Sequence, residues 1–317
     1  MSVADTPEQA ALRSALRDLL GRGLGGDALW KRLTGELGVA GLAVPAAYGG
    51  AGAGLAEIAI AVEETGRVLA PVPYLSTALA GHVLGLSEFS PGIADGSLRA
   101  AFVFSGSVAE GRVSGHAANV IDGSSADLFV VACEDSLWVV RARDARVTPL
   151  DTLDQTRSQA AVEFVSCAAV PVGGVSRDTA EDLFRVLLAV ESAAAAQHCL
   201  DVTVAYLKTR TQFGRVLGSF QALRHRCADL AVEVASARAT ARAAVAGDPW
   251  LLGPLAKKYC ADVFLHVAAE MIQLHGGIGF TWEHEAHRYL KRAKTTQLLL
   301  GSPDSLRRLV AARAGLY

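Results

Sequence analysis

Cysteine is scarce in this chain, and its cysteines are far apart. Only five occur in 317 residues, and no two of them form a C-x-x-C pair. An odd number of widely spaced thiols argues against a disulfide framework and against a zinc site, and it favours a reducing compartment. We therefore expect a cytoplasmic protein that binds no metal. The five are Cys133, Cys167, Cys199, Cys227 and Cys260.

A leader sequence and long apolar runs are also missing. Residues 1–9 contain no basic stretch followed by an apolar core, so no signal peptide is expected. No run reaches the roughly 18 apolar residues that a membrane span needs. Residues 187–196 come closest, but this stretch is Ala-rich and Glu191 interrupts it. Such a pattern is typical of a buried helix in a bundle, and we predict no membrane span.

The chain has no strong excess of charge of either sign. Its formal net charge is -2, which gives no electrostatic reason to expect nucleic acid as a partner. A hydrophobic content of 51% and a mean hydropathy of +0.29 indicate a globular chain with a large core. No G-x-G-x-x-G motif follows a predicted strand, so a Rossmann domain is not expected.

Two predicted segments precede the C-terminal part. Residues 1–97 form a helical N-terminal domain, because apolar residues recur at helical spacing over 10–20 and 55–69, with a Gly-rich loop at 49–54 between them. Residues 98–175 form a reduced middle β domain, because short β-branched or aromatic runs alternate with turn signals. The clearest of these runs are 100–104, 127–132 and 137–140.

The last segment, residues 176–317, is predicted to be a helical bundle. Asp248 followed by Pro249, and Ser302 followed by Pro303, are typical of an N-cap with proline at the first helical position. Long helices would pack antiparallel, as in a four-helix bundle. They are expected at about 177–210, 219–246 and 249–275. The predicted fold class is therefore mainly α with a small β domain.

Two motifs in the last segment carry the most specific signal. Residues 206–214 read Y-L-K-T-R-T-Q-F-G and run on to Phe220 and Gln221. Residues 273–281 read Q-L-H-G-G-I-G-F-T. Taken together at this spacing, the two motifs resemble the flavin-binding helices of the acyl-CoA dehydrogenase family.

The resemblance extends over most of the chain. Residues 41–50 resemble the family's G-L-x-x-P-x-x-Y-G-G segment, and residues 63–67 resemble the E-E-x-x-R stretch that follows it. The order of a helical, a β and a second helical segment is also that of the family. The resemblance thus implies the acyl-CoA dehydrogenase fold, with an N-terminal helical domain, a middle β domain and a C-terminal four-helix bundle.

The resemblance also implies a reaction and a cofactor. Family enzymes use FAD to remove hydrogens from Cα and Cβ of an acyl-CoA: a carboxylate takes the α proton and the flavin takes a hydride from Cβ. In most members the electrons pass to an electron-transferring flavoprotein. One FAD lies across a subunit interface, with its ring against the β domain of one subunit and its pyrophosphate and adenine end against the neighbour's bundle.

The motifs of this chain match the second of these two roles. Arg210 matches the family arginine at the FAD pyrophosphate, where a guanidinium can hold two phosphate oxygens. The alternative is that Arg210 caps a helix C-terminus and that the phenylalanines and glycines form core and turns. We favour the cofactor interpretation because both motifs occur together. The residues assigned to FAD are Arg210, Gln212, Phe213, Leu217, Phe220, Gln221, Gln273, Gly276 and Gly277.

The chain departs from the family at the flavin ring and at the catalytic base. The T-E-P…G-S-D type loop that opens the family's β domain has no counterpart in residues 98–115. Aligning residues 291–294 with the family's R-D-A-K places Leu300 where the glutamate base of the commonest members lies. Some members carry the base on the first bundle helix, and Phe184 occupies that position here. Neither side chain can accept a proton.

Other polar residues are weaker candidates. Asp182 and Arg185 match an Asp-x-x-Arg pair near the family's substrate, and their alternative is an i, i+3 surface pair on a helix. Glu191 could be a displaced base, but we favour a buried partner for an arginine of the bundle. His275 and His284 lack a carboxylate at metal-ligand spacing, and we interpret both as structural or cofactor-adjacent.

Three hypotheses follow. The favoured one is a subunit of a heteromeric FAD-dependent acyl-CoA dehydrogenase, inactive alone, whose larger family partner supplies the ring loop and the base. Short chains of this kind resemble the smaller subunits of the heterotetrameric (α2β2) acyl-CoA dehydrogenases of actinobacterial steroid (cholesterol) degradation, which implies a steroid-derived acyl-CoA substrate. The alternatives are a self-sufficient homo-oligomer that uses Glu191 as base, and a scaffold that has lost flavin binding.

Overall fold

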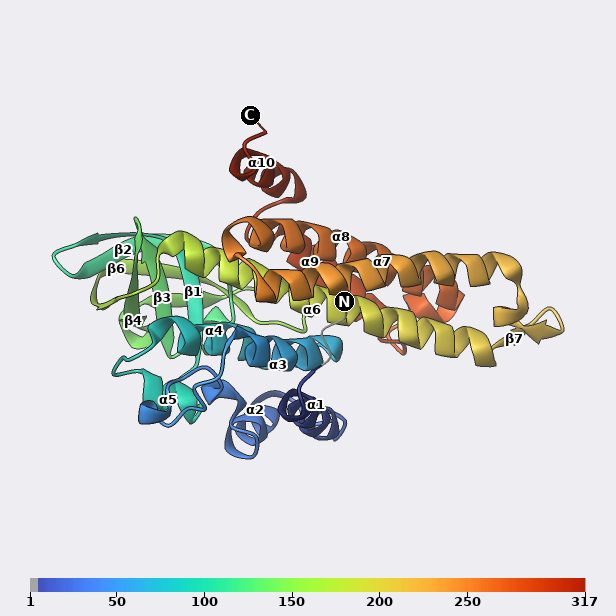
Figure 1. Cartoon of the computed structure of the whole chain (residues 1–317), viewed down its shortest axis with the longest axis horizontal. Coiled ribbons are helices and arrows are strands. Elements are labelled where there is room, and N and C mark those ends of the chain that lie inside the picture. Colours follow the sequence, from blue (N-terminus) through green and yellow to red (C-terminus); the bar gives the residue numbers. More distant parts are fainter. Residues whose placement is uncertain (1–4, 317) are drawn as a thin grey trace. The chain divides into compact units, whose positions relative to one another are not determined.

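The computed structural model describes residues 5–316 of the chain, which divide into two compact units (Figure 1). The first unit contains the chain up to Thr65 together with Ala70–Phe184. The second contains the short stretch Gly66–Leu69 and the chain from Arg185 onward. The order of a helical part, a β part and a second helical part is confirmed, and so is the predicted fold class.

The first unit begins with helices whose starts the sequence specifies. Thr6 forms a capping box with Gln9, and Pro7 occupies the first helical position of the first helix. The Gly-rich residues 49–54 remain a loop, because glycine loses more backbone entropy in a helix than other residues do. The helices are α1 (Pro7–Leu20), α2 (Gly26–Gly35), α3 (Leu55–Arg67), α4 (Tyr74–Leu84) and α5 (Ser90–Ala94), with 3-10 turns at Val39–Gly41 and Ala46–Tyr48.

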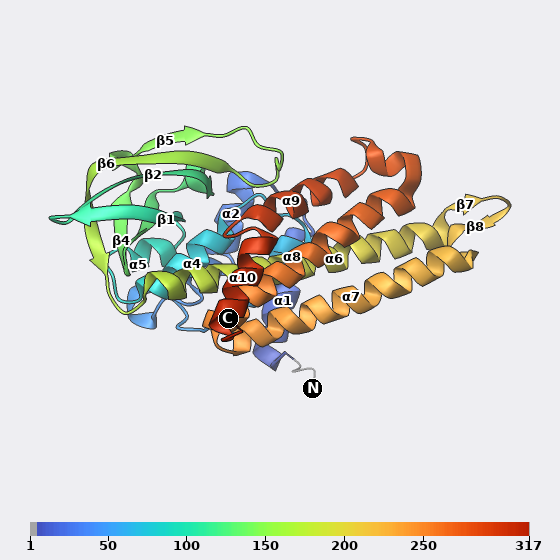
Figure 2. The ribbon, with the colours of Figure 1, turned by 90° about the horizontal axis from the view of Figure 1, so that it is seen from above.

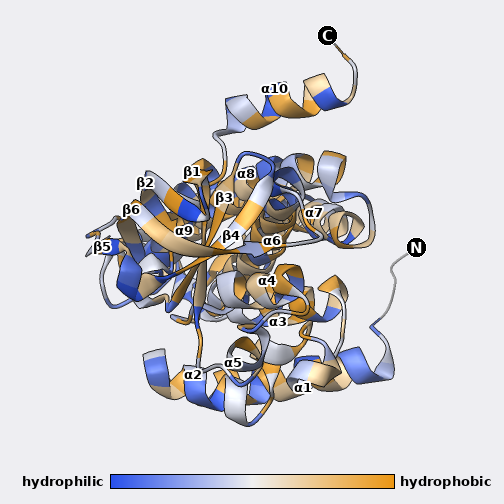
Figure 3. Cartoon of the chain, turned by 90° about the vertical axis from the view of Figure 1, so that its left-hand side faces the viewer, coloured by the Kyte–Doolittle hydropathy of each residue, from blue (hydrophilic) through white to orange (hydrophobic). Residues whose placement is uncertain are grey.

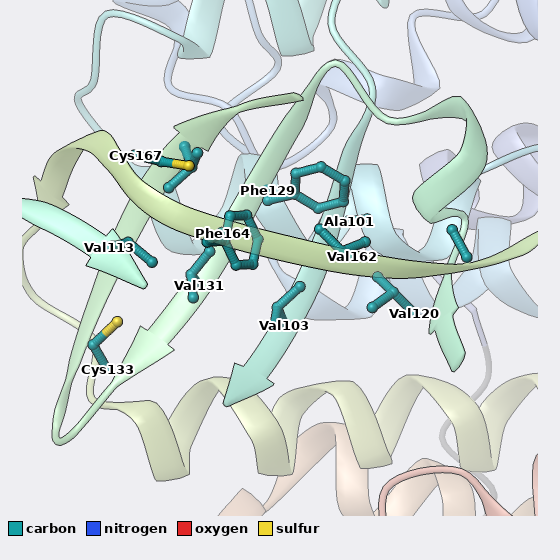
Figure 4. Packing of buried hydrophobic residues seen from close by; sticks show 12 residues of the cluster. Ala101, Val103, Val113, Val120, Phe129, Val131, Cys133, Val162, Phe164 and Cys167 are labelled. Atoms are coloured by element: carbon teal, nitrogen blue, oxygen red, sulfur yellow. The ribbon is translucent and has the colours of Figure 1, made fainter. Parts of the chain in front are cut away.

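The β part of this unit is a sheet of six strands. They are β1 (Ala100–Ala109), β2 (Arg112–Ile121), β3 (Leu128–Cys133), β4 (Ser136–Arg141), β5 (Arg146–Pro149) and β6 (Gln159–Val172). The pairings run β2-β1-β3-β4-β6-β5, and β2 also pairs with β6, so five of the strands close on themselves. Figure 4 shows Phe129, Phe164 and Val162 packed together in the resulting core, where each is buried.

The second unit is built from long helices that run beside one another (Figure 2). Helix α6 (Arg177–Thr209) enters it from the first unit, and α7 (Gln221–Ala246), α8 (Pro249–His275), α9 (Ala286–Leu298) and α10 (Pro303–Arg313) follow. A small hairpin of β7 (Thr211–Gln212) and β8 (Arg215–Val216) joins α6 to α7. The predicted caps are confirmed: Asp248 and Ser302 accept hydrogen bonds from the backbone N–H groups of Trp250 and Ser305.

Two helices show how hydropathy is distributed. Helix α6 is long and apolar enough in composition to cross a membrane, but 89% of its most apolar window is buried in the structure, as for the core helix of a bundle. Helix α10 carries hydrophobic and hydrophilic residues side by side (Figure 3), and its Leu306 is buried.

All five cysteines are free thiols.

A buried carboxylate joins α1 to α3. Both oxygens of Glu64 accept hydrogen bonds from Arg17, and Oε1 also accepts one from Arg13 at 2.7 Å. Burial of Glu64 opposes its ionisation, but the hydrogen bonds from Arg17 and Arg13 outweigh this effect and lower its pKa. The charged network therefore holds the first helix against the third.

This network predicts a loss of stability in acid. A carboxyl group whose pKa is lower in the folded state stabilises the fold above its unfolded pKa of about 4.3, and that stabilisation is lost as the pH falls through the folded pKa. We expect Glu64→Gln to lower the free energy of unfolding by about 2–3 kcal/mol at pH 7, with the difference from wild type shrinking towards pH 3. Denaturant titrations across this range measure it. Glu63→Gln, at a more exposed site on the same arginine, is the control, and an equal effect there would contradict the assignment.

Candidate functional site

The first motif forms the end of α6 and the hairpin after it. Phe213 and Gly214 form the hairpin turn with φ angles of 52° and 75°. Positive φ at both central residues is the geometry of two-residue hairpin turns, and glycine adopts it without strain. The N–H of Leu217 donates to the carbonyl of Arg210 at 2.8 Å, so the hairpin returns to the helix end. Arg210 is thereby held at the base of an exposed loop.

Aromatic side chains stand out from this hairpin. Phe213 is 88% exposed, and its ring meets that of Phe220 edge-on at 6.1 Å between centroids. The guanidinium of Arg215 lies 3.9 Å from the centroid of the Phe220 ring, as in a cation–π contact. The alternative that the phenylalanines of the motif are core residues is therefore wrong for Phe213.

The second motif forms the end of α8 and the 3-10 turn Gly276–Phe280. Gly276 has φ 61°, a conformation that favours glycine. A Cβ added to Gly276 or to Gly277 would meet no atom within 4 Å, whereas one added to Gly279 would lie 2.7 Å from the carbonyl of Ile272. Gly279 is thus required by packing, while the backbone at Gly276 and Gly277 is open to an incoming molecule.

One contact brings the two motifs together within the second unit. The ring of Tyr206 stacks on that of His275 with 4.4 Å between centroids, and its hydroxyl donates to the carbonyl of His275 at 3.4 Å. His275 in turn lies 4.3 Å from the ring of His284. Burial lowers the pKa of His275, although the hydrogen bond between its Nδ1 and the carbonyl of Met271 opposes this effect. The ring of His275 therefore serves as a packing surface between Tyr206 and His284.

The residues assigned to the cofactor lie in these two motifs, and none of them is buried. We call them the bundle-end surface: Arg210, Gln212, Phe213, Leu217, Phe220, Gln221, Gln273, Gly276 and Gly277. They supply a guanidinium, three carboxamides, exposed aromatic faces and open backbone. A guanidinium and carboxamides suit phosphate and ribose oxygens, and aromatic faces suit a flat heterocycle. The donor set fits a dinucleotide.

The two positions that the sequence predicts to correspond to the family's catalytic base hold apolar side chains. Phe184 is buried in the first unit, where its ring meets those of Phe102 and Phe104 edge-on at 5.6 and 6.0 Å. Leu300, in the second unit, has φ 52°, which is unusual for a bulky residue. Its carbonyl accepts a hydrogen bond from Arg185 at 3.0 Å. These two places therefore offer packing and backbone contacts, and no proton acceptor.

A buried lysine stabilises the segment that contains Leu300. Lys257 donates to the carbonyls of Gln297 and Gly301 at 2.8 and 2.7 Å. Burial, and then the charge of Arg185, lower the pKa of Lys257 to about 7. The side chains of Lys257 and Arg185 thus both donate to carbonyls at the end of α9, where the helix dipole is negative. The only feature of the sequence that could have indicated Lys257 is a lysine within a mostly apolar helix.

The remaining polar candidates are all buried. Glu191 accepts a hydrogen bond from Arg292 at 3.0 Å, and both side chains are buried, as expected for a partner of a bundle arginine. Gly66 leaves room for this carboxylate, because a Cβ there would lie 2.6 Å from its Cγ. The alternative of a surface pair is wrong for Asp182 and Arg185, since both are buried. Within the part of the chain that the structure describes, no three His, Cys, Asp or Glu side chains are placed to hold a metal ion.

Known proteins resemble the chain over nearly its whole length. Residues 6–87 match the profile of the acyl-CoA dehydrogenase N-terminal domain, and residues 179–315 match that of the C-terminal domain. The acyl-CoA dehydrogenase IpdE2 of Mycolicibacterium smegmatis is 38% identical, over 98% of this chain and 96% of that protein.

Solved structures extend the likeness to three dimensions. A chain described as "Tcur3481-Tcur3483 steroid ACAD G363A variant" is 27% identical with a TM-score of 0.88, over 98% of this chain and 99% of that chain. A chain of the ChsE4-ChsE5 complex from Mycobacterium tuberculosis has the same fold, with a TM-score of 0.88 at 23% identity and complete coverage of both chains.

Proposed function

Because this chain belongs to the acyl-CoA dehydrogenase family, we propose that it is one subunit of a heteromeric, FAD-dependent acyl-CoA dehydrogenase. In this proposal the chain binds the pyrophosphate and adenine end of an FAD whose ring lies in a larger partner subunit of the same family. The partner also supplies the catalytic base. The chain alone is inactive.

The bundle-end surface is the observation that carries the proposal. The hairpin presents Arg210, and the turn after α8 presents open backbone at Gly276 and Gly277. The contact between Tyr206 and His275 holds the hairpin and the turn after α8 together. A scaffold that had lost flavin binding would have no reason to keep a guanidinium, carboxamides and bare backbone together in one exposed place.

The apolar residues at the two base positions support the division of labour. Phe184 packs among aromatic rings, and Leu300 contributes only its carbonyl to a hydrogen bond. Glu191, the carboxylate that a self-sufficient enzyme would need, is held by Arg292. The carboxylate of Glu191 is thus engaged in a buried ion pair within the bundle.

The residues of this chain would act by binding and orientation. Arg210 would hold pyrophosphate oxygens with two N–H groups, and Gln212, Gln221 and Gln273 would bond along the nucleotide. When bound, FAD supplies the hydride acceptor. The rigid contact between Tyr206 and His275 would keep the adenine end in place, so that the ring is positioned at the partner's substrate site.

The similarity to a chain described as a steroid ACAD supports a substrate class. We propose a steroid-derived acyl-CoA, an α2β2 assembly, an electron-transferring flavoprotein as acceptor and a cytoplasmic location. The free thiols agree with a reducing compartment.

The test compares this chain expressed alone with the chain co-expressed with an acyl-CoA dehydrogenase homologue encoded next to it. Particle mass, FAD content and acyl-CoA oxidation are measured on each preparation. We expect the chain alone to be colourless and inactive, and the co-expressed pair to be yellow and active, with about one FAD for each pair of chains. A yellow homo-oligomer that oxidises acyl-CoA unaided would contradict the proposal, and a stable pair without FAD would favour a scaffold.

A further inference from the structure

The hairpin between α6 and α7 carries a second arginine that is not among the residues assigned to FAD. Arg215 lies on β8 and is exposed. Residues 202–228 contain no aspartate or glutamate, and within residues 5–316 Arg215 forms no ion pair. An exposed guanidinium that lacks a carboxylate partner is available to a ligand from outside the chain.

The hairpin places Arg215 on the same face as two of the assigned residues. Gln212 and Arg215 are paired across β7 and β8 in antiparallel register. Paired residues point to the same face of a hairpin, and so do residues two apart along a strand. Arg210 precedes Gln212 by two residues, and its hydrogen bond with Leu217 continues the pairing. A ligand that contacts Arg210 and Gln212 from this face can therefore extend to Arg215.

The ring of Phe220 supports the guanidinium of Arg215. The Cζ of Arg215 lies over this ring, 3.9 Å from its centroid, which is within the distance of a cation–π contact. Phe213 meets the same ring edge-on, so Phe220 is itself braced. Arg215 remains exposed, and the side of its guanidinium away from Phe220 is open to solvent.

A guanidinium supported by an aromatic ring provides a stacking surface for a flat base. The group is planar, delocalised and weakly hydrated, and proteins that bind unpaired bases stack them on arginine side chains. We propose that the adenine base of FAD stacks on the open side of the Arg215 guanidinium, with Phe220 behind it. This inference rests on the proposed function, in which the chain binds the adenine end of FAD. Arg210 then binds the pyrophosphate, and Arg215 binds the base.

The experiment titrates the FAD-free co-expressed pair with FAD and follows flavin fluorescence. We expect Arg215→Ala to raise the dissociation constant of FAD about 10-fold, as for the loss of one stacked base. Arg215→Lys should raise it nearly as much, because an ammonium group keeps the charge but has no flat face. Arg242→Ala, at an exposed site near the far end of α7, is the control and should bind FAD as the wild type does. The denaturation midpoints should stay at the wild-type value, since Arg215 is exposed.

Competition with fragments of the cofactor separates the base from the phosphates. ADP and inorganic pyrophosphate are each used to displace FAD from the pair. Arg215→Ala should raise the inhibition constant of ADP about 10-fold and leave that of pyrophosphate unchanged. Arg210→Ala should raise both constants, because both fragments carry the phosphates that Arg210 binds.

Three results would overturn the role of Arg215 alone. Wild-type FAD affinity in Arg215→Lys, with weaker pyrophosphate binding in Arg215→Ala, would make Arg215 a phosphate contact. Wild-type FAD affinity in both variants would remove Arg215 from the site. CoA also contains adenine, so a higher Michaelis constant for acyl-CoA with unchanged FAD affinity would assign the base to CoA. In each case the wild-type pair still binds FAD, and the proposed function stands. A wild-type pair that binds no FAD would overturn both.

Discussion

Replacing Glu191 with alanine is expected to lower the free energy of unfolding by about 3–5 kcal/mol, because it leaves a buried guanidinium without its carboxylate. Arg292 donates to Glu191 at 3.0 Å, and both side chains are buried in the second unit. Gly66 and Glu191 approach each other so closely that the site is shaped around the carboxylate. The loss should appear as a lower denaturation midpoint of the co-expressed pair. Replacing the exposed Glu283 with alanine is the control, and surface changes of this kind alter stability by less than about 0.5 kcal/mol.

The conservative variant separates structure from catalysis. Glu191→Gln keeps the shape and one hydrogen-bond acceptor for Arg292, so the pair should fold and retain its FAD. If the partner holds the base, the turnover number should stay within a few-fold of wild type. Loss of a general base costs about 10²–10⁴-fold in rate, so a drop of that size with FAD retained would move the base to this chain.

The fold could be predicted because its signals are local. Caps at Asp248 and Ser302 and the period of the apolar residues lie within each helix, so the long helices were predicted close to their observed bounds. The sheet was harder. Strands β1, β3 and β4 each contain an apolar run, whereas β2 reads R-V-S-G-H-A-A-N-V-I and depends on its pairing with β6. A strand specified by its neighbour has little signal of its own.

The candidate site was predictable as two motifs but not as an arrangement. Each motif is contiguous in the sequence, so its residues could be recognised together. The Tyr206–His275 contact joins residues 69 positions apart, and the Glu191–Arg292 pair joins residues 101 positions apart. Nothing in either local sequence selects its partner. Lys257 was missed for the same reason, because its hydrogen bonds go to backbone carbonyls of another helix end.

The exposure of aromatic side chains could not be predicted from the sequence. A sequence pattern cannot distinguish a phenylalanine of the core from one on the surface, and the burial of Phe184 contrasts with the 88% exposure of Phe213. Both residues are phenylalanines in segments predicted to be helix or turn. Only the three-dimensional structure distinguishes a buried ring such as that of Phe184 from an exposed ring such as that of Phe213. The exposure of Phe213 supports the proposal that the bundle-end surface binds part of a cofactor.

Replacing Arg210 with alanine is expected to weaken FAD binding by the co-expressed pair by about 10- to 100-fold, because a charged hydrogen-bond donor to phosphate contributes about 1.5–3 kcal/mol. The stability of the chain itself should change little, since Arg210 is exposed at the base of the hairpin and its backbone contact to Leu217 is kept. Fluorescence titration of the apo-pair with FAD measures the affinity. Arg242→Ala, an exposed arginine near the opposite end of α7, controls for the loss of a positive charge.

A variant of the second motif decides whether both motifs bind one ligand. A Cβ at Gly277 meets no atom within 4 Å, so Gly277→Val should fold normally and weaken FAD only by occupying the approach to the backbone. If Arg210 and Gly277 contact opposite ends of the same nucleotide, the double variant should weaken binding by roughly the product of the single effects, since distant sites add in free energy. Unchanged FAD affinity in Arg210→Ala would remove its assigned role, and unchanged affinity in both variants would leave the bundle-end surface without a cofactor.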